Sequence, residues 1–152
     1  MNRPQVRLLD ARRAGLDETG LRAWARSVTD ASGARYVARS YRWPWCLVAW
    51  HDAPVGVDLE RLEPVDRAFA ESIATPGERA ELAGREHDTG WAIALWSSKE
   101  ALSKALGDAL LYDPGRLEAP ARWPGLRSGP WRAAAVAAPP GHTGWLCWRV
   151  AE

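Results

Sequence analysis

Two short stretches of the chain combine residue types that together can bind a metal ion and a phosphoanhydride. The first stretch is Val55-Gly56-Val57-Asp58-Leu59-Glu60. Side chains alternate between the faces of a strand, so Asp58 and Glu60 share one face and the apolar residues share the other. Two such carboxylates repel each other unless they are solvated, paired with a positive charge or bridged by a cation, and Mg²⁺ prefers oxygen ligands of this kind together with phosphate oxygens. The alternative is an ordinary solvent-facing strand.

The second stretch, residues 96–104, reads W-S-S-K-E-A-L-S-K and is predicted to be helical. Glu100 and Lys104 lie one turn apart, so a metal ligand or base and a phosphate contact would face the same side. The alternative is a surface ion pair, which stabilises a helix by about 0.2–0.5 kcal/mol. Lys99 and Lys104 are the only two lysines of the chain, beside eighteen arginines. Because a compact ammonium and a planar guanidinium are not equivalent, this clustering also indicates a site.

The elements that must position these residues follow from periodicity and turn signals. We expect a helix over residues 17–29, a helical region over 65–83 that is interrupted at Thr75-Pro76-Gly77, and a helix over 91–106 that ends at Gly107. Strands are expected over residues 5–11, 35–40, 46–50 and 55–59, and the segments 131–138 and 144–150 are expected to pair. This order predicts an α+β domain with helices packed on a mostly antiparallel sheet.

Taken together, the two stretches resemble the paired signature of the 4′-phosphopantetheinyl transferases, a strand with G-x-D-x-E followed by a helix with W-S-x-K-E-A-x-x-K. Forty residues separate Glu60 from Glu100, which is similar to the monomeric surfactin-synthetase-activating type. The resemblance implies a 4′-phosphopantetheinyl transferase-like fold of two pseudo-symmetric α/β halves, with coenzyme A and Mg²⁺ in the cleft between them. We expect a single domain, with a reduced first half over residues 1–52 and a second half over residues 53–152 that carries the motifs.

The resemblance also implies a role for each matching residue. Asp58, Glu60 and Glu100 would coordinate Mg²⁺ on the pyrophosphate of coenzyme A, and Lys104 would contact a phosphate oxygen and take part in catalysis. Glu100 would help to deprotonate the serine of an acyl or peptidyl carrier protein, and adenosine 3′,5′-bisphosphate would leave. Lys99 matches the motif and is assigned to cofactor binding, with a structural or carrier-facing role as the alternative.

Two features depart from the family pattern. A Ser-His-Ser stretch usually precedes the first motif, and this chain has Ala38-Arg39-Ser40. Arg39 can replace the histidine as a phosphate donor, or it can fill the pocket and prevent normal binding. Only 57 residues precede Asp58, fewer than in the larger type. Four arginines are available to compensate, or they form a solvated helix face and turn: Arg12, Arg13, Arg22 and Arg26.

The composition bounds the remaining choices. A net charge of +1 over 152 residues gives no bulk electrostatic reason to expect nucleic acid or a membrane surface as a partner. Cys46 and Cys147 lie in apolar surroundings without a C-x-x-C pair, which favours buried reduced thiols and a cytoplasmic protein. The sequence leaves both a monomer and a homodimer open. We therefore expect phosphopantetheinyl transfer to a carrier protein. The alternatives are a repurposed homologue acting on a carrier-bound or small-molecule intermediate in natural-product biosynthesis, and a non-catalytic module that binds carrier protein or coenzyme A.

Overall fold

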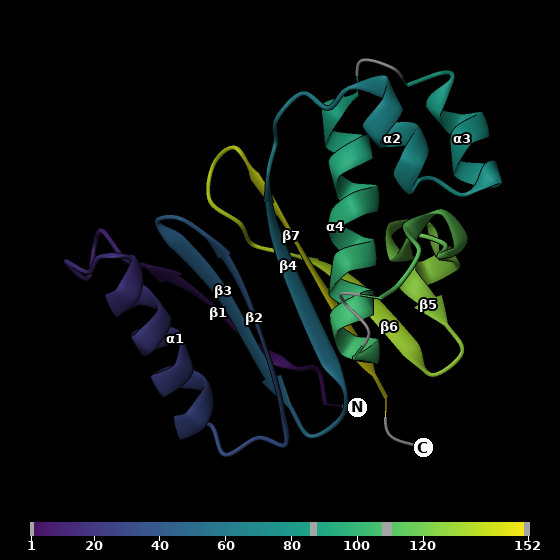
Figure 1. Cartoon of the computed structure of the whole chain (residues 1–152). Helices are drawn as coiled ribbons and strands as arrows, with labels where there is room; N and C mark the ends of the chain where they lie inside the picture. The colour runs from purple at the N-terminus through teal and green to yellow at the C-terminus, as the bar shows by residue number, and fades with distance from the viewer. Residues whose placement is uncertain (1, 86–87, 108–110, 151–152) are drawn as a thin grey trace.

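The structure, a computed structural model, describes residues 2–85, 88–107 and 111–150. Its N-terminal part is a three-stranded antiparallel sheet with strand order β1-β3-β2. The strands are β1 (Gln5–Asp10), β2 (Tyr36–Arg42) and β3 (Trp45–His51), and helix α1 (Glu18–Ala31) covers one face of the sheet (Figure 1). Leu21 and Ala25 of α1 are buried against Leu9, Cys46 and Val48 of the sheet. Their burial fixes the helix on this face.

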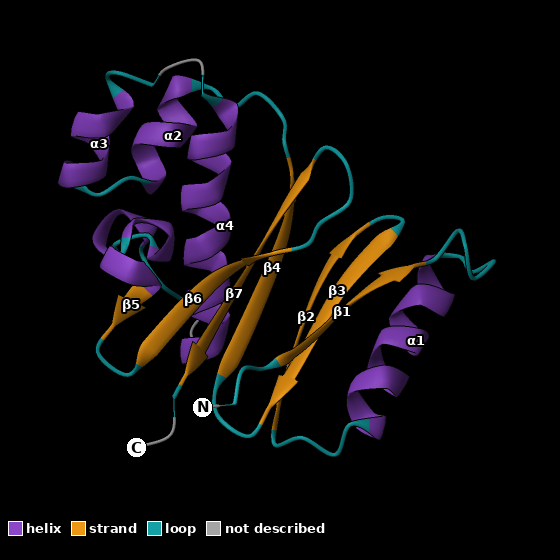
Figure 2. Ribbon diagram, turned by 180° about the vertical axis from the view of Figure 1, so that it is seen from behind, coloured by secondary structure: helices purple, strands orange, loops and turns teal. Residues whose placement is uncertain are grey.

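The remaining strands form a second antiparallel sheet with order β4-β7-β6-β5. These strands are β4 (Val55–Arg61), β5 (Arg127–Ser128), β6 (Trp131–Val136) and β7 (His142–Arg149). The long helix α4 (Thr89–Leu106) packs along β4 and β7 on one face of this sheet (Figure 2). Gly107, with a φ of 87°, ends the helix in the left-handed conformation that glycine adopts without strain.

Two short helices, α2 (Arg67–Ile73) and α3 (Pro76–Leu82), connect β4 to α4. The break between them has a clear chemical cause. The Thr75 side chain accepts a hydrogen bond from the backbone of Glu78, and the Glu78 side chain accepts one from the backbone of Thr75, which is a capping box. Pro76 occupies the first turn, where its missing N–H costs nothing. Three single 3₁₀ turns follow α4: Pro114–Arg116, Pro120–Arg122 and Pro124–Leu126.

The two sheets meet where β2 and β4 run side by side (Figure 1). No ladder of backbone hydrogen bonds joins these strands among the described residues, and the Ser40 hydroxyl bridges them instead. It accepts a hydrogen bond from the Leu59 backbone at 3.0 Å and donates one to Asp58 Oδ1 at 3.4 Å. Below this seam an apolar cluster draws on both sheets, with Leu47 and Ala49 of β3 packed against Val57 and Leu59 of β4.

The fold class expected from the sequence is confirmed: the chain is α+β with antiparallel sheets and helices on their faces. The expected interruption at Thr75-Pro76, the end of the long helix at Gly107 and the pairing of the last two strands are confirmed as well. The division at residues 52 and 53 stays a prediction. No helix in the described part of the chain is both long and apolar enough to cross a membrane.

Candidate active site

Helix α4 approaches β4 unusually closely, and Gly56 makes this approach possible. A Cβ atom on Gly56 would lie 1.9 Å from the carbonyl oxygen of Ala101 and 2.6 Å from the backbone nitrogen of Ala105. Only a residue without a side chain fits there. The glycine of the G-x-D-x-E motif therefore sets the distance between the carboxylates of the strand and the residues of the helix.

The alternation predicted for β4 is confirmed. Val57 and Leu59 point into the apolar cluster between the sheets, whereas Asp58 and Glu60 point to the side of α4 and β2. The expectation of a solvent-facing strand is wrong for Asp58, whose exposed fraction is only 3%. Two acidic residues thus lie on a strand whose neighbours cover it from both sides, and each needs a specific partner.

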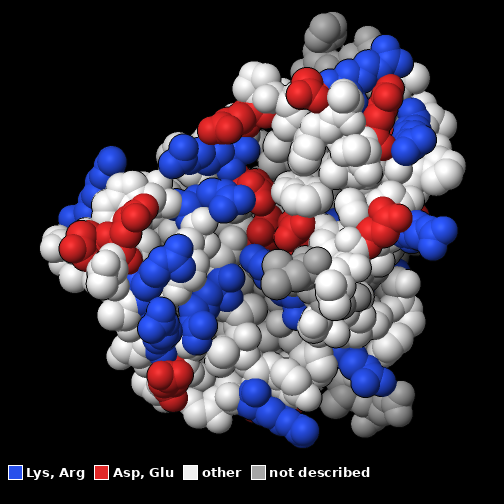
Figure 3. All heavy atoms as spheres, viewed as in Figure 1, with Lys and Arg blue, Asp and Glu red and all other residues white. Residues whose placement is uncertain are grey.

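A pocket of about 380 Å³ opens at the junction of β2, β4 and α4. Figure 3 shows acidic side chains gathered at the middle of this face, with lysine and arginine side chains beside them on the side of α1 and β2. The lining residues that carry charge are Arg22, Arg39, Arg42, Asp58, Glu60, Glu100 and Lys104. The structure therefore brings together every residue assigned to the site from the sequence except Lys99.

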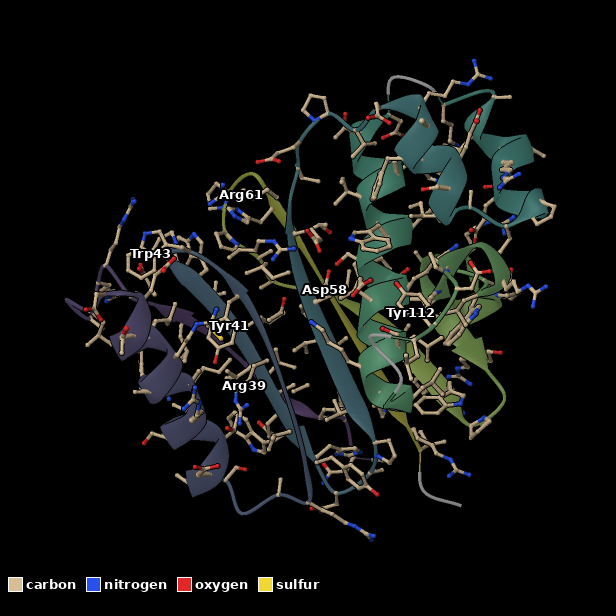
Figure 4. The ribbon with its side chains drawn as sticks, in the orientation of Figure 1. Arg39, Tyr41, Trp43, Asp58, Arg61 and Tyr112 are labelled. Carbon is tan, nitrogen blue, oxygen red and sulfur yellow. The ribbon has the colours of Figure 1, made fainter. Side chains whose placement is uncertain are left out.

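Asp58 lies at the centre of this arrangement (Figure 4). Its Oδ1 atom accepts hydrogen bonds from Ser40 and from Lys104 Nζ, the latter at 3.3 Å, whereas Oδ2 is buried and has no hydrogen-bond partner in the described part of the chain. Burial raises the pKa of Asp58 to about 7; the nearby Lys104 ammonium opposes this shift and the Glu60 carboxylate adds to it. A buried carboxyl with an unpaired oxygen beside a second carboxylate is a position that a cation would stabilise.

The other two predicted metal ligands have protein partners. Glu60 Oε2 accepts hydrogen bonds from Arg42 Nη2 at 2.7 Å and from Arg42 Nε at 3.3 Å. Glu100 Oε1 accepts one from the hydroxyl of Tyr112 at 2.5 Å. In each carboxylate these hydrogen bonds from Arg42 and Tyr112 engage only one of the two oxygens.

Lys104 connects the helix to the strand. Its Nζ atom donates to the carbonyl oxygen of Val57 at 2.9 Å as well as to Asp58, and 26% of its side chain is exposed. It is half-buried in the pocket, where its charge is available to an anionic ligand. The surface ion pair with Glu100 that the spacing suggested is not formed, because the ammonium reaches across to β4.

Lys99 requires a correction. Its side chain is completely buried and points away from the pocket, where Nζ donates to Glu78 Oε1 and to the carbonyl oxygens of Ile73 and Pro114. Glu78 Oε2 in turn accepts a hydrogen bond from the backbone of Ala119. Cofactor binding by Lys99 is at odds with this burial, and so is a carrier-facing role. The contacts support the structural alternative, in which Lys99 ties α3 and the segment after α4 to the long helix.

Arg39 lines the pocket from the α1 side of β2 (Figure 4). Its Nε atom donates to the hydroxyl of Thr29 on α1 at 3.2 Å. This contact holds the guanidinium at the rim, so it does not fill the centre where Asp58 lies. Arg22 of α1 stands beside it, with its guanidinium 4.3 Å from the ring centre of Tyr41. Of the four arginines considered as replacements, Arg22 lines the pocket and Arg12, Arg13 and Arg26 do not.

Three of the residues that matter here fall outside the assignments made from sequence: Ser40, Arg42 and Tyr112. Ser40 and Arg42 share one face of β2, and this alternation was the signal that could have grouped them. No local sequence pattern shows that β2 lies next to β4. The pairing of Ser40 with Asp58 and of Arg42 with Glu60 therefore could not be predicted from the sequence. Tyr112 follows the helix motif in a loop and carries no periodic signal.

The donor set at the pocket fits a divalent cation. Three carboxylates, from β4 and α4, line the same pocket, and the buried Oδ2 of Asp58 has no hydrogen-bond partner among the described residues. These are hard oxygen ligands of the kind that Mg²⁺ takes alongside phosphate oxygens. Among the described residues no group of three or more acidic, histidine or cysteine side chains is already drawn together as a closed metal cage. The three carboxylates therefore do not enclose a metal position, because Glu60 accepts hydrogen bonds from Arg42 and Glu100 accepts one from Tyr112.

Two hollows continue the pocket in opposite directions. One shares Arg39 and Lys104 with it and extends along Val37 and Val55. The other shares Arg42, Glu60 and Trp96 and extends to Ile93 and Phe69, whose ring meets Trp96 edge to face at 5.5 Å. The charged centre is thus flanked by one hollow with two basic residues and apolar walls and by another that combines aromatic and apolar side chains with arginine and glutamate, which suits an elongated ligand with charged and apolar parts.

The comparisons with known proteins show what this chain is similar to, an α+β fold in which an acidic strand and a Lys/Glu helix meet in one charged pocket. Residues 54–128, just under half of the chain, match the model of the 4′-phosphopantetheinyl transferase superfamily. The chain is 36% identical over 75 residues to the 4′-phosphopantetheinyl transferase psf-1 of Bacillus pumilus, covering 48% of this chain and 32% of that protein. It is 27% identical over 113 residues to the 4′-phosphopantetheinyl transferase Sfp of Bacillus subtilis strain 168, covering 69% of this chain and 50% of that protein. The chain thus spans between a third and a half of the length of these two relatives.

Proposed function

We propose that the protein transfers the 4′-phosphopantetheine arm of coenzyme A to a serine of an acyl or peptidyl carrier protein. The observation that carries the proposal is the meeting of Asp58, Glu60, Glu100 and Lys104 in one pocket, which two separate sequence motifs supply. The match of residues 54–128 to the superfamily model supports the same reaction, and both relatives are named for it.

In this proposal the pyrophosphate of coenzyme A occupies the centre of the pocket. Mg²⁺, held by Asp58, Glu60 and Glu100, would neutralise the phosphate oxygens and hold the anhydride in place. Lys104 adds a positive charge beside Asp58 and balances the negative charge that develops on the leaving phosphate. Arg39 and Arg22 provide guanidinium groups at the rim for a further phosphate of the nucleotide. The hollow at Phe69 and Trp96 accommodates the pantetheine chain.

The chemical step needs a base and a leaving group. Glu100 accepts the proton of the carrier serine, and the serine oxygen forms a bond to the β-phosphorus of coenzyme A. The bond between this phosphorus and the bridging oxygen breaks, and adenosine 3′,5′-bisphosphate leaves with the electron pair. Because the anhydride provides the driving force, the protein has only to position the groups and balance their charge.

Mass spectrometry of an apo carrier protein tests the proposal. After incubation with the protein, coenzyme A and Mg²⁺, the carrier should gain the mass of one phosphopantetheine arm, and EDTA should abolish the gain. Glu100→Gln should lower the rate by at least about 10²-fold, the typical contribution of a general base. If no carrier gains mass and calorimetry detects no binding of coenzyme A, the proposal is wrong. Transfer at the normal rate by Glu100→Gln would refute the role of Glu100 alone.

A second candidate is a repurposed homologue that keeps the pocket for a different reaction on a carrier-bound or small-molecule intermediate. One observation favours it: Arg42 already provides a positive charge to Glu60, so one predicted metal ligand is paired without a metal. In that case coenzyme A or an acylated carrier would bind, and no mass would be transferred to an apo carrier.

A further inference from the structure

Tyr112 makes a contact with the pocket that neither motif contains. It lies in the loop that follows α4, and its hydroxyl donates to Glu100 Oε1 at 2.5 Å. Figure 4 shows it beside the C-terminal part of α4, on the other side of the helix from β2. Glu100 is the residue to which the proposed function gives two roles, as metal ligand and as base. A group that controls the direction of its carboxylate therefore controls both.

The contact restrains a side chain that is otherwise free to turn. A glutamate has three rotatable bonds, and fixing such a side chain costs about 1–2 kcal/mol of conformational entropy. Among the described residues, Tyr112 is the only hydrogen-bond donor found for the Glu100 carboxylate. One oxygen is thus held by the phenol, and the second oxygen remains available to a cation or to a serine hydroxyl.

The phenol is suited to this role because it can only donate here. An ionised carboxylate has no proton to give, so the phenolic O–H is the donor in this contact. The other tyrosines are used differently: Tyr41 stacks under Arg22, and Tyr36 lies 5.4 Å from the guanidinium of Arg35. Packing alone would not require the hydroxyl, because a phenylalanine ring fills nearly the same space.

We propose that Tyr112 is a positioning residue for Glu100, which holds one carboxylate oxygen and presents the other to the metal and to the serine of the carrier. This inference rests on the proposed function. It predicts a contribution comparable to that of other hydrogen-bond partners of metal ligands, whose loss lowers metal affinity about 10–100-fold. Loss of the Tyr112 hydroxyl should weaken metal binding only by changing the orientation of Glu100, and the other proposed ligands, Asp58 and Glu60, should be unaffected.

Titration of the isolated protein with Mn²⁺ in a calorimeter measures this effect without relying on activity. Tyr112→Phe should bind Mn²⁺ about tenfold more weakly than the wild type, and Tyr112→Leu should lose a similar factor because both lack the hydroxyl. Tyr36→Phe, which removes a hydroxyl remote from the pocket, should bind normally. In a Glu100→Gln background, Tyr112→Phe should cause no further loss, because the double-mutant cycle isolates their coupling.

The outcomes separate the two proposals. Equal Mn²⁺ affinity of wild type and Tyr112→Phe overturns the role of Tyr112 and leaves the proposed function intact. A loss that persists in full in the Glu100→Gln background also overturns it, since Tyr112 would then act by general packing. If the wild type itself binds neither Mn²⁺ nor Mg²⁺, the inference fails, whereas the proposed function fails only if the apo carrier gains no mass and coenzyme A does not bind. Circular dichroism melting curves in EDTA verify that each variant is folded, and because Tyr112→Phe retains the ring, it should melt close to the wild type.

Discussion

Arg42 and Glu60, eighteen residues apart in the sequence, form a two-pronged ion pair at the point where the two sheets meet. Nη2 and Nε of the guanidinium lie 2.7 and 3.3 Å from the same carboxylate oxygen, and 13% of the Glu60 side chain is exposed. The pair closes the seam between β2 and β4 above Ser40. It also places a fixed positive charge on a residue that we assign to a metal ion, so Arg42 and the metal compete for Glu60.

The first prediction concerns this competition. Arg42→Met should bind Mg²⁺ several-fold more tightly than the wild type, because the metal no longer displaces a guanidinium from Glu60. In EDTA the same variant should be less stable, by about 1–3 kcal/mol, because a partly buried carboxylate loses its charged hydrogen-bond partner. Calorimetric titration and urea unfolding measure the two effects. Arg61→Met is the matched control, since Arg61 ends the adjacent strand, is half exposed and contacts Glu63 at 3.9 Å and the carbonyl oxygen of Trp43 at 3.1 Å, so it pairs with none of the proposed metal ligands. Weaker binding by Arg42→Met would show that Arg42 supports the metal site and does not compete with it.

The second prediction concerns the pH dependence of stability in the absence of metal. The pKa of Asp58 is about 7 in the folded protein, above its ordinary value of 3.8. As the pH rises from 4 to 7, the unfolded chain releases this proton while the folded protein retains it, so the free energy of unfolding falls. Above pH 7 the loss is complete and amounts to no more than about 4 kcal/mol. Asp58→Asn has no such proton and should escape the loss.

Thermal melting in EDTA at pH 5 and pH 8 tests this prediction. The melting temperature of Asp58→Asn should exceed that of the wild type at pH 8, and the difference should shrink at pH 5. Excess Mg²⁺ at pH 8 should raise the melting temperature of the wild type and leave that of the variant unchanged. An equal difference at both pH values would mean that Lys104 keeps Asp58 ionised throughout, and the raised pKa would then be wrong.

Local pattern was enough to predict most elements of this fold. Alternation placed Asp58 and Glu60 on one face of a strand, and the capping residues Thr75 and Gly107 marked a helix start and a helix end where the structure has them. What could not be predicted is which strands become neighbours. β4 pairs with β7, more than eighty residues later, and lies beside β2 without a backbone ladder. Such contacts depend on how the whole chain packs, so a short stretch of sequence does not reveal them.

The same limit explains which site residues were missed or misassigned. Lys99 and Lys104 look equivalent in the motif, but five positions along a helix are about 500° of rotation, well over one full turn. The two ammonium groups therefore leave the helix in different directions, one into the core and one into the pocket. Burial of Lys99 depends on Glu78, whose position is set by the capping box of a different helix. The clustering of the two lysines in the sequence indicated a site, but only the fold shows that Lys99 pairs with Glu78 in the core and that Lys104 lines the pocket.

The third prediction follows from this buried pair. Lys99→Met should lower the free energy of unfolding by up to about 3–5 kcal/mol, because the fully buried Glu78 carboxylate loses its close ammonium partner and keeps only the Arg122 guanidinium, 3.8 Å away. Lys99→Met combined with Glu78→Gln should be less damaging than Lys99→Met alone, since the buried negative charge that only the more distant Arg122 then balances is removed, and an oxygen acceptor remains for the backbone of Ala119. Urea unfolding provides the values.

Arg116→Ala is the control for that series, because Arg116 pairs with Asp113 at 3.9 Å and is almost fully exposed. Its change in stability should stay below about 1 kcal/mol. A Lys99→Met protein as stable as the wild type would show that the pair is not what holds α3 and the loop after α4 against the long helix.

The fourth prediction concerns Gly56, which sets the distance between the two halves of the site. In Gly56→Ala the new methyl group would overlap the backbone of Ala101, with 1.9 Å between the atoms, and backbone cannot turn aside as a side chain can. Helix α4 must therefore move outward, at a cost of about 1–3 kcal/mol or more. The movement carries Glu100 and Lys104 away from Asp58, so metal affinity should fall together with stability.

Gly90→Ala is the matched control on the same helix. Its added methyl group would meet nothing closer than Asp88 Oδ1 at 3.5 Å, an ordinary contact, and alanine favours a helix over glycine by up to about 1 kcal/mol. This variant should be at least as stable as the wild type and should bind Mn²⁺ equally well. If Gly56→Ala unfolds at the same urea concentration and binds Mn²⁺ as tightly as Gly90→Ala, the helix tolerates a wider spacing from β4. In that event the site depends on the reach of its side chains and not on the close approach of α4.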